Sequence, residues 1–121
     1  MIKGLRTVIY PASDLAAAKA WYSEVLDKPP YFDEPYYVGF DVGGFELGLI
    51  PDGTPGVSGS VAYWGVLEAD SALERLQQLG GTVHEAVKSV GGGIKVASVL
   101  DPFGNVFAII ENPNFDPKNV A

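Results

Sequence analysis

The stretch at residues 90–105, VGGGIKVASVLDPFGN, decides the fold expected for this chain. Three glycines lead into an apolar run rich in β-branched residues, which predicts a strand. The segment DPFGN at 101–105 has the composition of a tight turn, because proline fixes φ, glycine accepts positive φ, and Asp and Asn side chains bond turn amides. A second apolar run starts at Val106. The stretch therefore predicts a β-hairpin closed by this turn.

The predicted order of elements occurs twice along the chain. Apolar and alternating runs predict strands at residues 5–10, 37–42, 45–50, 61–66, 82–87, 94–100 and 106–110. Asp14 follows the first of these strands as Glu68 follows the fourth, an offset of 68 − 14 = 54 residues. Each half is thus a βαβββ unit, although residues 32–37 of the first half look like an aromatic loop rather than a strand. Ferredoxin-like folds, which also give β-α-β-β patterns, are the alternative at this point.

Two segments have the apolar spacing of helices, at 14–26 and at 69–79. Ser13 can cap the first helix. In the second, Ser71 and Glu74 have the spacing of a capping box. Each helix follows the first strand of its half, as a repeated unit requires.

At 121 residues the chain suffices for one domain with a real core and is too short for two independent ones. Hydrophobic residues make up 47% and charged residues 19%, which indicates a folded chain. One βαβββ unit cannot bury its sheet alone, so two are expected to pair in one body. We therefore expect one domain over 1–121, with module one at 1–54, a Gly- and Pro-rich connector at 51–60, module two at 60–112 and a polar tail at 113–121.

Composition excludes several classes of function. The chain has no cysteine, so disulfides, thiolate metal sites and cysteine nucleophiles are ruled out, which fits a reducing compartment. It has no apolar run near the roughly 18–20 residues of a membrane span and no signal-like start, so we expect a cytoplasmic protein without a membrane partner. Its net charge is −7 and its 8 basic residues are scattered, so nucleic acid is not an expected partner.

Four segments in a fixed order carry a family resemblance. They are Asp14-Leu15 at the first helix, Trp21-Tyr22 followed by Val25-Leu26, YWGV at 63–66 and DPFGN at 101–105. In these segments the chain resembles the vicinal oxygen chelate superfamily, the glyoxalase/bleomycin resistance protein/dioxygenase group. The resemblance implies an α+β fold in which two βαβββ modules form a curved mixed sheet around a central cavity. It also implies a homodimer, with modules that pair within a chain or across chains.

The resemblance further implies a divalent metal, held by His and Glu side chains from the first and last strands of the modules. The matching positions here hold Thr7, Val61 and Ala108, and the fourth lies near Leu47. Val, Ala and Leu offer no donor atom to a metal. We therefore expect the family's fold without its metal and without a cofactor.

The leading expectation is a protein that binds a small organic molecule in the central cavity, as in the drug-sequestering branch of the family. The residues expected to contact this ligand are Thr7, Phe40, Val61, Trp64 and Ala108. Aromatic residues at 31–37 would add a wall, which favours a planar or aromatic ligand. The net charge of −7 favours neutral or cationic solutes over anions.

Glu46 supports an enzyme as the alternative. It interrupts an apolar strand, and alternation alone cannot decide whether it faces the cavity, as a base or a cation partner, or faces solvent. In the cavity, Glu46 would be the catalytic residue of a lyase or isomerase, related to lactoylglutathione lyase, that uses general acid–base chemistry. His84, the only histidine, stands beside Glu85, and because adjacent strand residues face opposite ways the two are not expected in one pocket. A purely structural or interaction module is the third interpretation.

Overall fold

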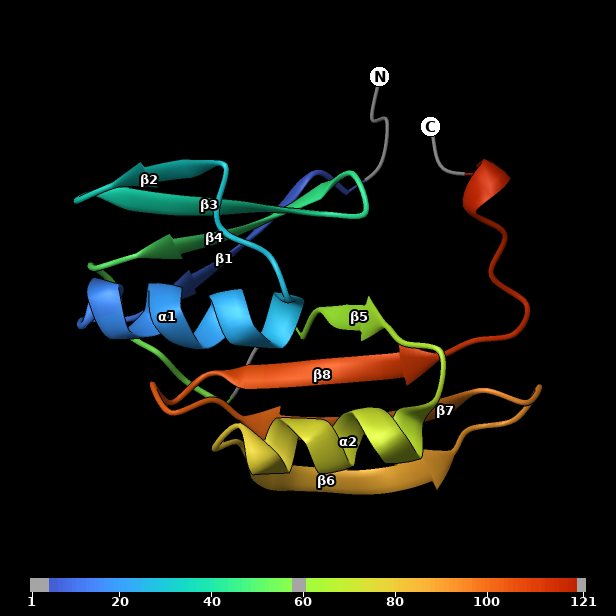
Figure 1. Ribbon diagram of the computed structural model, residues 1–121. Coiled ribbons are helices and arrows are strands. Elements are labelled where there is room, and N and C mark those ends of the chain that lie inside the picture. The colour runs from blue at the N-terminus through green and yellow to red at the C-terminus, as the bar shows by residue number, and fades with distance from the viewer. Residues whose placement is uncertain (1–4, 58–60, 120–121) are drawn as a thin grey trace. The chain divides into compact units, whose positions relative to one another are not determined.

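The computed structural model describes residues 5–57 and 61–119, and the chain divides into two compact units, Met1–Pro55 and Gly56–Ala121. The first unit contains β1 (Thr7–Pro11), α1 (Leu15–Leu26), β2 (Phe32–Glu34), β3 (Tyr37–Val42) and β4 (Phe45–Ile50) (Figure 1). The second contains β5 (Tyr63–Gly65), α2 (Ala69–Gln78), β6 (Thr82–Ser89), β7 (Lys95–Leu100), β8 (Val106–Glu111) and a 3₁₀ turn, Pro117–Asn119. Residues 58–60 of the predicted connector and 120–121 of the predicted tail lie outside the described residues.

Both units have the same topology, which confirms the internal repeat and the α+β fold. The strand order is β1-β4-β3-β2 in the first unit and β5-β8-β7-β6 in the second, so each described sheet is open, with an edge strand at both ends. The first and last strands of each unit pair in parallel, and the other pairs are antiparallel. The helices begin at Leu15 and Ala69, and 69 − 15 = 54 is the offset found in the sequence.

The stretch predicted as an aromatic loop contains a short edge strand. β2 pairs antiparallel with β3, with Phe32 opposite Gly39. Just before it, the backbone N–H of Tyr31 donates to the carbonyl of Gly39 at 3.0 Å. Hydrogen bonds to a neighbouring strand thus make a strand that the local sequence pattern does not indicate.

The ends of α1 are set by two aspartates. The side chain of Asp14, and not that of Ser13, accepts the N–H of Ala17, at 3.0 Å. At the other end Asp27 takes the left-handed conformation, with φ of 54°, that usually selects glycine. Asp14 therefore does the capping that the sequence assigns to Ser13.

The capping box predicted for α2 is not formed. The N-cap is Glu68, which makes no side-chain cap bond, and Ser71 lies inside the first turn. The N–H of Ala69 donates instead to Oε1 of Glu111 at 2.8 Å, from the end of β8. The start of α2 is thus satisfied by a carboxylate distant in sequence, which also opposes the positive end of the helix dipole.

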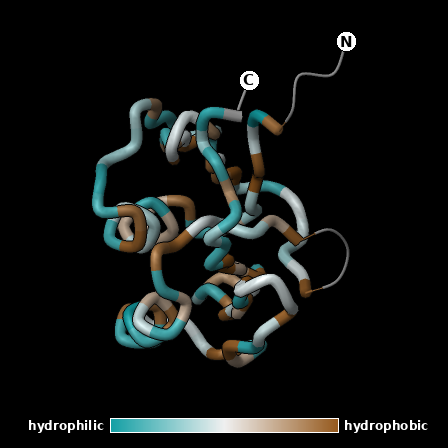
Figure 2. Tube along the Cα trace, turned by 90° about the vertical axis from the view of Figure 1, so that its right-hand side faces the viewer, coloured by the Kyte–Doolittle hydropathy of each residue, from teal (hydrophilic) through white to brown (hydrophobic). Residues whose placement is uncertain are grey.

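Each helix packs on one face of its own sheet, and this face is the core of the unit. In the first unit the buried apolar residues include Tyr10, Ala18, Trp21, Tyr22, Val38, Phe40, Leu47 and Leu49, and in the second Ala69, Leu73, Leu76, Ala97, Val99, Phe107 and Ile109. Figure 2 shows hydrophobic and hydrophilic residues around both helices, as this one-sided packing requires. Side chains alternate along a strand, so the intervening residues project from the face that no helix of the same unit covers. No helix in the described part of the chain is long and apolar enough to cross a membrane.

Candidate functional site

Glu46 lies on the face of the first sheet that α1 does not cover. Leu47, the next residue of β4, is fully buried in the core, so Glu46 projects from the opposite face. The strand pairing puts Glu46 directly between Thr7 on β1 and Asp41 on β3. Directly opposed residues share a face, so these three polar side chains form a row across three strands. In the described part of the chain, neither carboxylate of this row forms an ion pair.

Two tyrosine hydroxyls hold the Glu46 carboxylate. Tyr31 donates to Oε1 and Tyr37 donates to Oε2. Tyr37 is half-buried, and this burial raises the pKa of its phenol above the ordinary value of 10.0, so the hydroxyl keeps its proton at neutral pH. Each carboxylate oxygen has two lone pairs, so each keeps one for a further donor. The carboxylate is therefore fixed in orientation and still able to accept hydrogen bonds from a ligand.

A pair of glycines leaves room for the Tyr37 ring. Gly39 and Gly48 stand directly opposite each other on β3 and β4. A Cβ at Gly48 would overlap the Tyr37 hydroxyl and lie 2.7 Å from Cζ of the ring. A Cβ at Gly39 would lie 3.2 Å from Cε2 of Tyr37. The Tyr37 ring thus occupies the space that a side chain at Gly48 would take.

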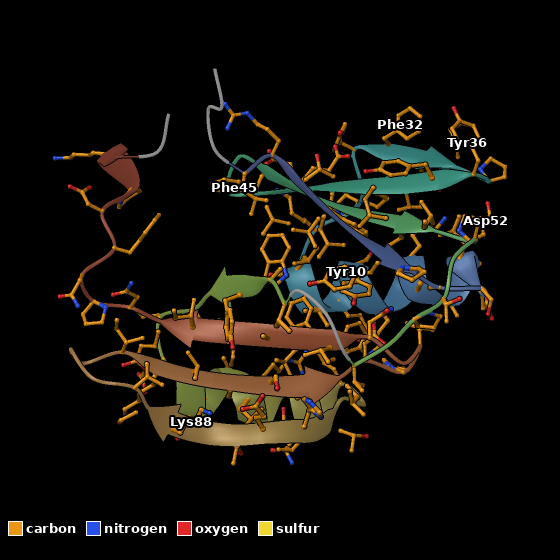
Figure 3. The ribbon with its side chains drawn as sticks, turned by 180° about the vertical axis from the view of Figure 1, so that it is seen from behind. Tyr10, Phe32, Tyr36, Phe45, Asp52 and Lys88 are labelled. Atoms are coloured by element: carbon orange, nitrogen blue, oxygen red, sulfur yellow. The ribbon has the colours of Figure 1, made fainter. Side chains whose placement is uncertain are left out.

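Further aromatic rings continue this site along β2. The centroid of the Phe32 ring lies 6.0 Å from that of Tyr37 and 6.1 Å from that of Tyr36, in edge-to-face pairs. Figure 3 shows Phe32 and Tyr36 on the side of the sheet away from α1. Tyr31 and Tyr36 are 65% and 66% exposed, so their rings are accessible to a ligand. We call this group the aromatic–carboxylate cluster; its members are Tyr31, Phe32, Tyr36, Tyr37 and Glu46.

The second unit contains a pocket against its own sheet, with a volume of about 70 Å³. The residues that line it are Val57, Val61, Tyr63, His84, Glu85, Val96, Ala97, Ser98, Val106 and Ala108. Most of them are apolar, and they include Val61 and Ala108, two of the predicted ligand contacts. Ala108 is fully buried and Val61 is 40% exposed, so the pocket has an apolar floor and an accessible rim.

Ser98 is the buried polar residue of this pocket. Ser98 is only 4% exposed. Among the described residues, its Oγ is the one buried side-chain nitrogen or oxygen that has no hydrogen-bond partner. A buried hydroxyl left unsatisfied costs about 1–3 kcal/mol, so native proteins keep few of them. Ser98 thus combines a place in the lining of the pocket with a hydroxyl that has no partner among the described residues.

His84 and Glu85 both line the pocket, although strand alternation predicts that they face opposite ways. That prediction was wrong because β6 is irregular. Its register against β7 shifts between Val83 and Glu85 and again between Glu85 and Lys88. Such a bulge breaks the alternation of side chains and turns neighbouring residues toward the same side.

The other predicted ligand contacts lie in different places. Thr7 is beside Glu46 on the first sheet. Phe40 is fully buried in the core on the side of α1. Trp64 is paired with Ile109, and its ring stacks on that of Phe107, on the core side of the second sheet.

Tyr63, rather than the neighbouring Trp64 that was expected to contact the ligand, is the aromatic residue of this pocket. It stands directly opposite Ala108 and lines the pocket, whereas Trp64 does not. The signal was present in the sequence, because Val61 and Tyr63 are two residues apart and share a face of a strand. If Val61 faces the ligand, Tyr63 therefore faces it too, and Trp64 projects from the opposite face of the strand.

The donor atoms at the family's metal positions do not fit a divalent metal of the kind that the resemblance implies. In the first unit the pairing puts Glu46, not Leu47, opposite Thr7, and both oxygens of Glu46 already accept a phenol hydrogen bond. In the second unit a phenol, Tyr63, stands opposite the methyl group of Ala108. The described residues contain no group of three or more His, Cys, Asp or Glu side chains that could hold a metal.

The same fold occurs in solved structures. A glyoxalase-related enzyme from Fulvimarina pelagi aligns with a TM-score of 0.74 at 22% identity, over 93% of this chain and 90% of that one. A glyoxalase/bleomycin resistance protein from Albidiferax ferrireducens T118 aligns with a TM-score of 0.73 at 18% identity, over 90% and 98%. Lactoylglutathione lyase from Agrobacterium tumefaciens aligns with a TM-score of 0.73 at 22% identity, over 96% and 100%. At these identities the likeness shows the fold alone.

Sequence comparison identifies the family. No curated protein matches the chain significantly in sequence. The family model described as Glyoxalase/Bleomycin resistance protein/Dioxygenase superfamily matches residues 4–109, which is most of the chain and includes both βαβββ units. The chain therefore belongs to the Glyoxalase/Bleomycin resistance protein/Dioxygenase superfamily.

Proposed function

We propose that this protein binds a small organic molecule, planar or partly aromatic, without the metal typical of its family. The observation that carries the proposal is the aromatic–carboxylate cluster. It presents an oriented carboxylate, Glu46, among accessible aromatic rings on a sheet face that its own helix leaves uncovered. A carboxylate with aromatic neighbours is suited to a positively charged organic group.

The charges around Glu46 favour a cation. Asp41 stands directly opposite Glu46, and like charges opposed across strands destabilise a sheet. The net charge of −7 adds to the attraction, although salt screens it beyond about 8–10 Å. The two free lone pairs of the carboxylate match the parallel N–H donors of a planar amidinium or guanidinium. Stacking of such a group on an exposed tyrosine would add about 0.5–1 kcal/mol.

Benzamidine and benzamide test this proposal, because they have nearly the same shape and differ in charge. We expect calorimetry to show benzamidine binding at least tenfold more tightly than benzamide. Glu46→Gln should weaken benzamidine about tenfold or more, since a hydrogen bond to a charged group is worth about 1.5–3 kcal/mol. Glu24→Gln is the matched control, because it removes the same charge from an exposed site on α1. Equal binding of the two probes, or an unchanged affinity in Glu46→Gln, would contradict the proposal.

An enzyme is the second candidate, and the position of Glu46 favours it. A carboxylate on the uncovered face, held by two phenols, is a candidate general base of a lyase or isomerase. In turnover, the lone pair that each oxygen of Glu46 keeps free would accept the substrate proton. We would test wild type and Glu46→Gln with lactoylglutathione and other glutathione conjugates. Turnover abolished in Glu46→Gln with binding retained would support the enzyme over the binding protein.

The absence of the metal is a separate part of the proposal. Its support is the donor set, a threonine and an engaged carboxylate in one unit and a phenol opposite a methyl group in the other. We expect substoichiometric metal after purification without a tag, and no shift in melting temperature with excess Ni²⁺, Zn²⁺ or Mn²⁺. Tight binding would stabilise the fold by about 3 kcal/mol at a hundredfold excess over Kd, which such a measurement detects easily.

We also propose that the protein is located in the cytoplasm and forms a homodimer. The cysteine-free composition supports a reducing compartment. Location is testable by fractionation of cells that express the full chain, where recovery with periplasmic or membrane markers would contradict it.

A further inference from the structure

We propose that the pocket of the second unit is a subsite for a neutral, oxygen-bearing group, a carbonyl or a hydroxyl, that hydrogen-bonds to Oγ of Ser98. This subsite deepens the proposed function, on which it rests, because it names a neutral group that a small organic molecule bound by this protein would carry. The argument has three steps: the unpaired hydroxyl, the walls around it, and the size of the space.

The unpaired hydroxyl shows where the polar atom belongs. Ser98 lies in the middle of β7, opposite Ala108 on β8 and Glu85 on β6. It is 4% exposed, lines the pocket, and has no hydrogen-bond partner for its Oγ in the described part of the chain. A serine hydroxyl can donate one hydrogen bond and accept two. A carbonyl or hydroxyl of the ligand therefore satisfies it, whereas an alkyl group would leave it buried and unpaired.

The walls require the group to be neutral. Four of the lining residues are valines, and Ala108 at the floor is fully buried. A charged group at Ser98 would lose its hydration and gain one neutral partner, which does not offset the loss. The ionisable side chains of the lining, Tyr63, His84 and Glu85, belong to exposed residues at the rim. A charged group of a ligand would therefore find charged partners only at the rim of the pocket. The buried part of the pocket suits a neutral group.

The size limits the group to a few heavy atoms. Pockets that bury a whole drug-sized molecule measure about 300–1,000 Å³. This pocket, at about 70 Å³, takes one end of such a molecule. A short branched alkyl group with one carbonyl fits the apolar walls and reaches the hydroxyl.

Three probes with the same branched alkyl group test the subsite: isobutyramide, which is neutral, isobutyrate, which is anionic, and isobutylamine, which is cationic. Binding is followed by chemical shifts of the backbone amides of Ser98 and Ala108. We expect isobutyramide to shift both and to bind Ser98→Ala about fivefold to tenfold more weakly, as loss of one hydrogen bond predicts. Ser89→Ala is the matched control, because Ser89 is exposed and does not line the pocket. Equal affinity of wild type and Ser98→Ala would overturn the proposal, as would binding of isobutyrate or isobutylamine as tight as that of isobutyramide.

The ligand-free protein provides a second readout. Ser98→Ala removes a buried hydroxyl that has no partner, so its melting temperature should equal or exceed that of wild type. A lower melting temperature would mean that the hydroxyl has a structural partner, which overturns the proposal. Isobutyramide carries no charge, so failure of this test leaves the benzamidine test of Glu46 standing. Failure of the benzamidine test, in turn, does not change the shifts expected at Ser98.

Discussion

The Tyr37 ring packs directly over Gly48 on the face of the first sheet, and this packing helps to fix the position of the Glu46 carboxylate. The Tyr37 ring fills the volume that a Cβ of Gly48 would need, and its hydroxyl reaches Oε2 of Glu46. Tyr31 reaches the other oxygen from the end of β2. At the residue scale the site therefore depends on the absence of a side chain at Gly48 as much as on the two tyrosine hydroxyls that donate to Glu46.

Gly48→Ala tests this arrangement. Its Cβ would overlap the Tyr37 hydroxyl, so we expect the ring to leave Glu46 and the free energy of unfolding to fall by about 1–3 kcal/mol, as in other overpacked sites. The pKa of Tyr37 should fall back toward its ordinary value of 10.0 as the ring loses its burial, which ultraviolet titration measures. Gly39→Ala is the control and should cost less, because its closest contact with the ring is 3.2 Å. Equal losses in the two variants would contradict this interpretation.

At the scale of elements, the β7–β8 hairpin was predictable because its bonds are local. Oδ1 of Asp101 accepts the backbone N–H groups of Phe103 at 2.9 Å and Asn105 at 2.8 Å. Gly104 takes a φ of 92°, which glycine adopts at little cost. All of these features depend on residue types at fixed local spacing, so the turn could be predicted from the local sequence alone.

Asp101→Ala should therefore destabilise the fold strongly. Asp101 is 4% exposed, and two backbone N–H groups would lose their acceptor. Hydrogen bonds to a charged group are worth about 1.5–3 kcal/mol, so we expect a loss of at least about 2 kcal/mol in urea unfolding. Asp52→Ala removes an exposed carboxylate from another loop and should change the unfolding free energy by less than about 0.5 kcal/mol. A loss in Asp101→Ala no greater than that in Asp52→Ala would show that the turn does not depend on this side chain.

Other elements could not be predicted, because their causes lie outside the local pattern. β2 exists through hydrogen bonds to β3, and α2 is capped by Glu111 from another strand. His84 and Glu85 share a pocket because β6 changes register against β7. For the candidate site, the sequence indicated Glu46 and Val61 but not the facing of the strands. The unpaired hydroxyl of Ser98 appears only once strand pairing and burial are known, whereas Tyr63 follows from its two-residue spacing to Val61.

At the scale of the whole molecule, two units of one topology differ in chemistry on their uncovered sheet faces. The first presents a carboxylate held by phenols, and the second presents an apolar pocket with one hydroxyl. The two copies of one scaffold thus carry different chemistry, a charged site in the first unit and a neutral one in the second. The repeat conserves the strand order, while single positions such as Glu46 and Ala108 set the chemistry of each face.

Exposed apolar side chains on this molecule lead to the prediction of a homodimer. Leu67 is 92% exposed just before α2, Ile9 on β1 is 51% exposed, and both sheets have open edges. Closed two-fold pairing is the commonest way in which proteins cover such surfaces. Sedimentation at micromolar concentration should give the mass of two chains, and a monomer there would contradict the prediction.

Leu67→Lys should shift the equilibrium toward monomer, because it puts a charge where an apolar contact is expected. Val90→Lys, at a turn residue that is 54% exposed, should not. A wild-type dimer that Leu67→Lys leaves intact would place the interface on another surface.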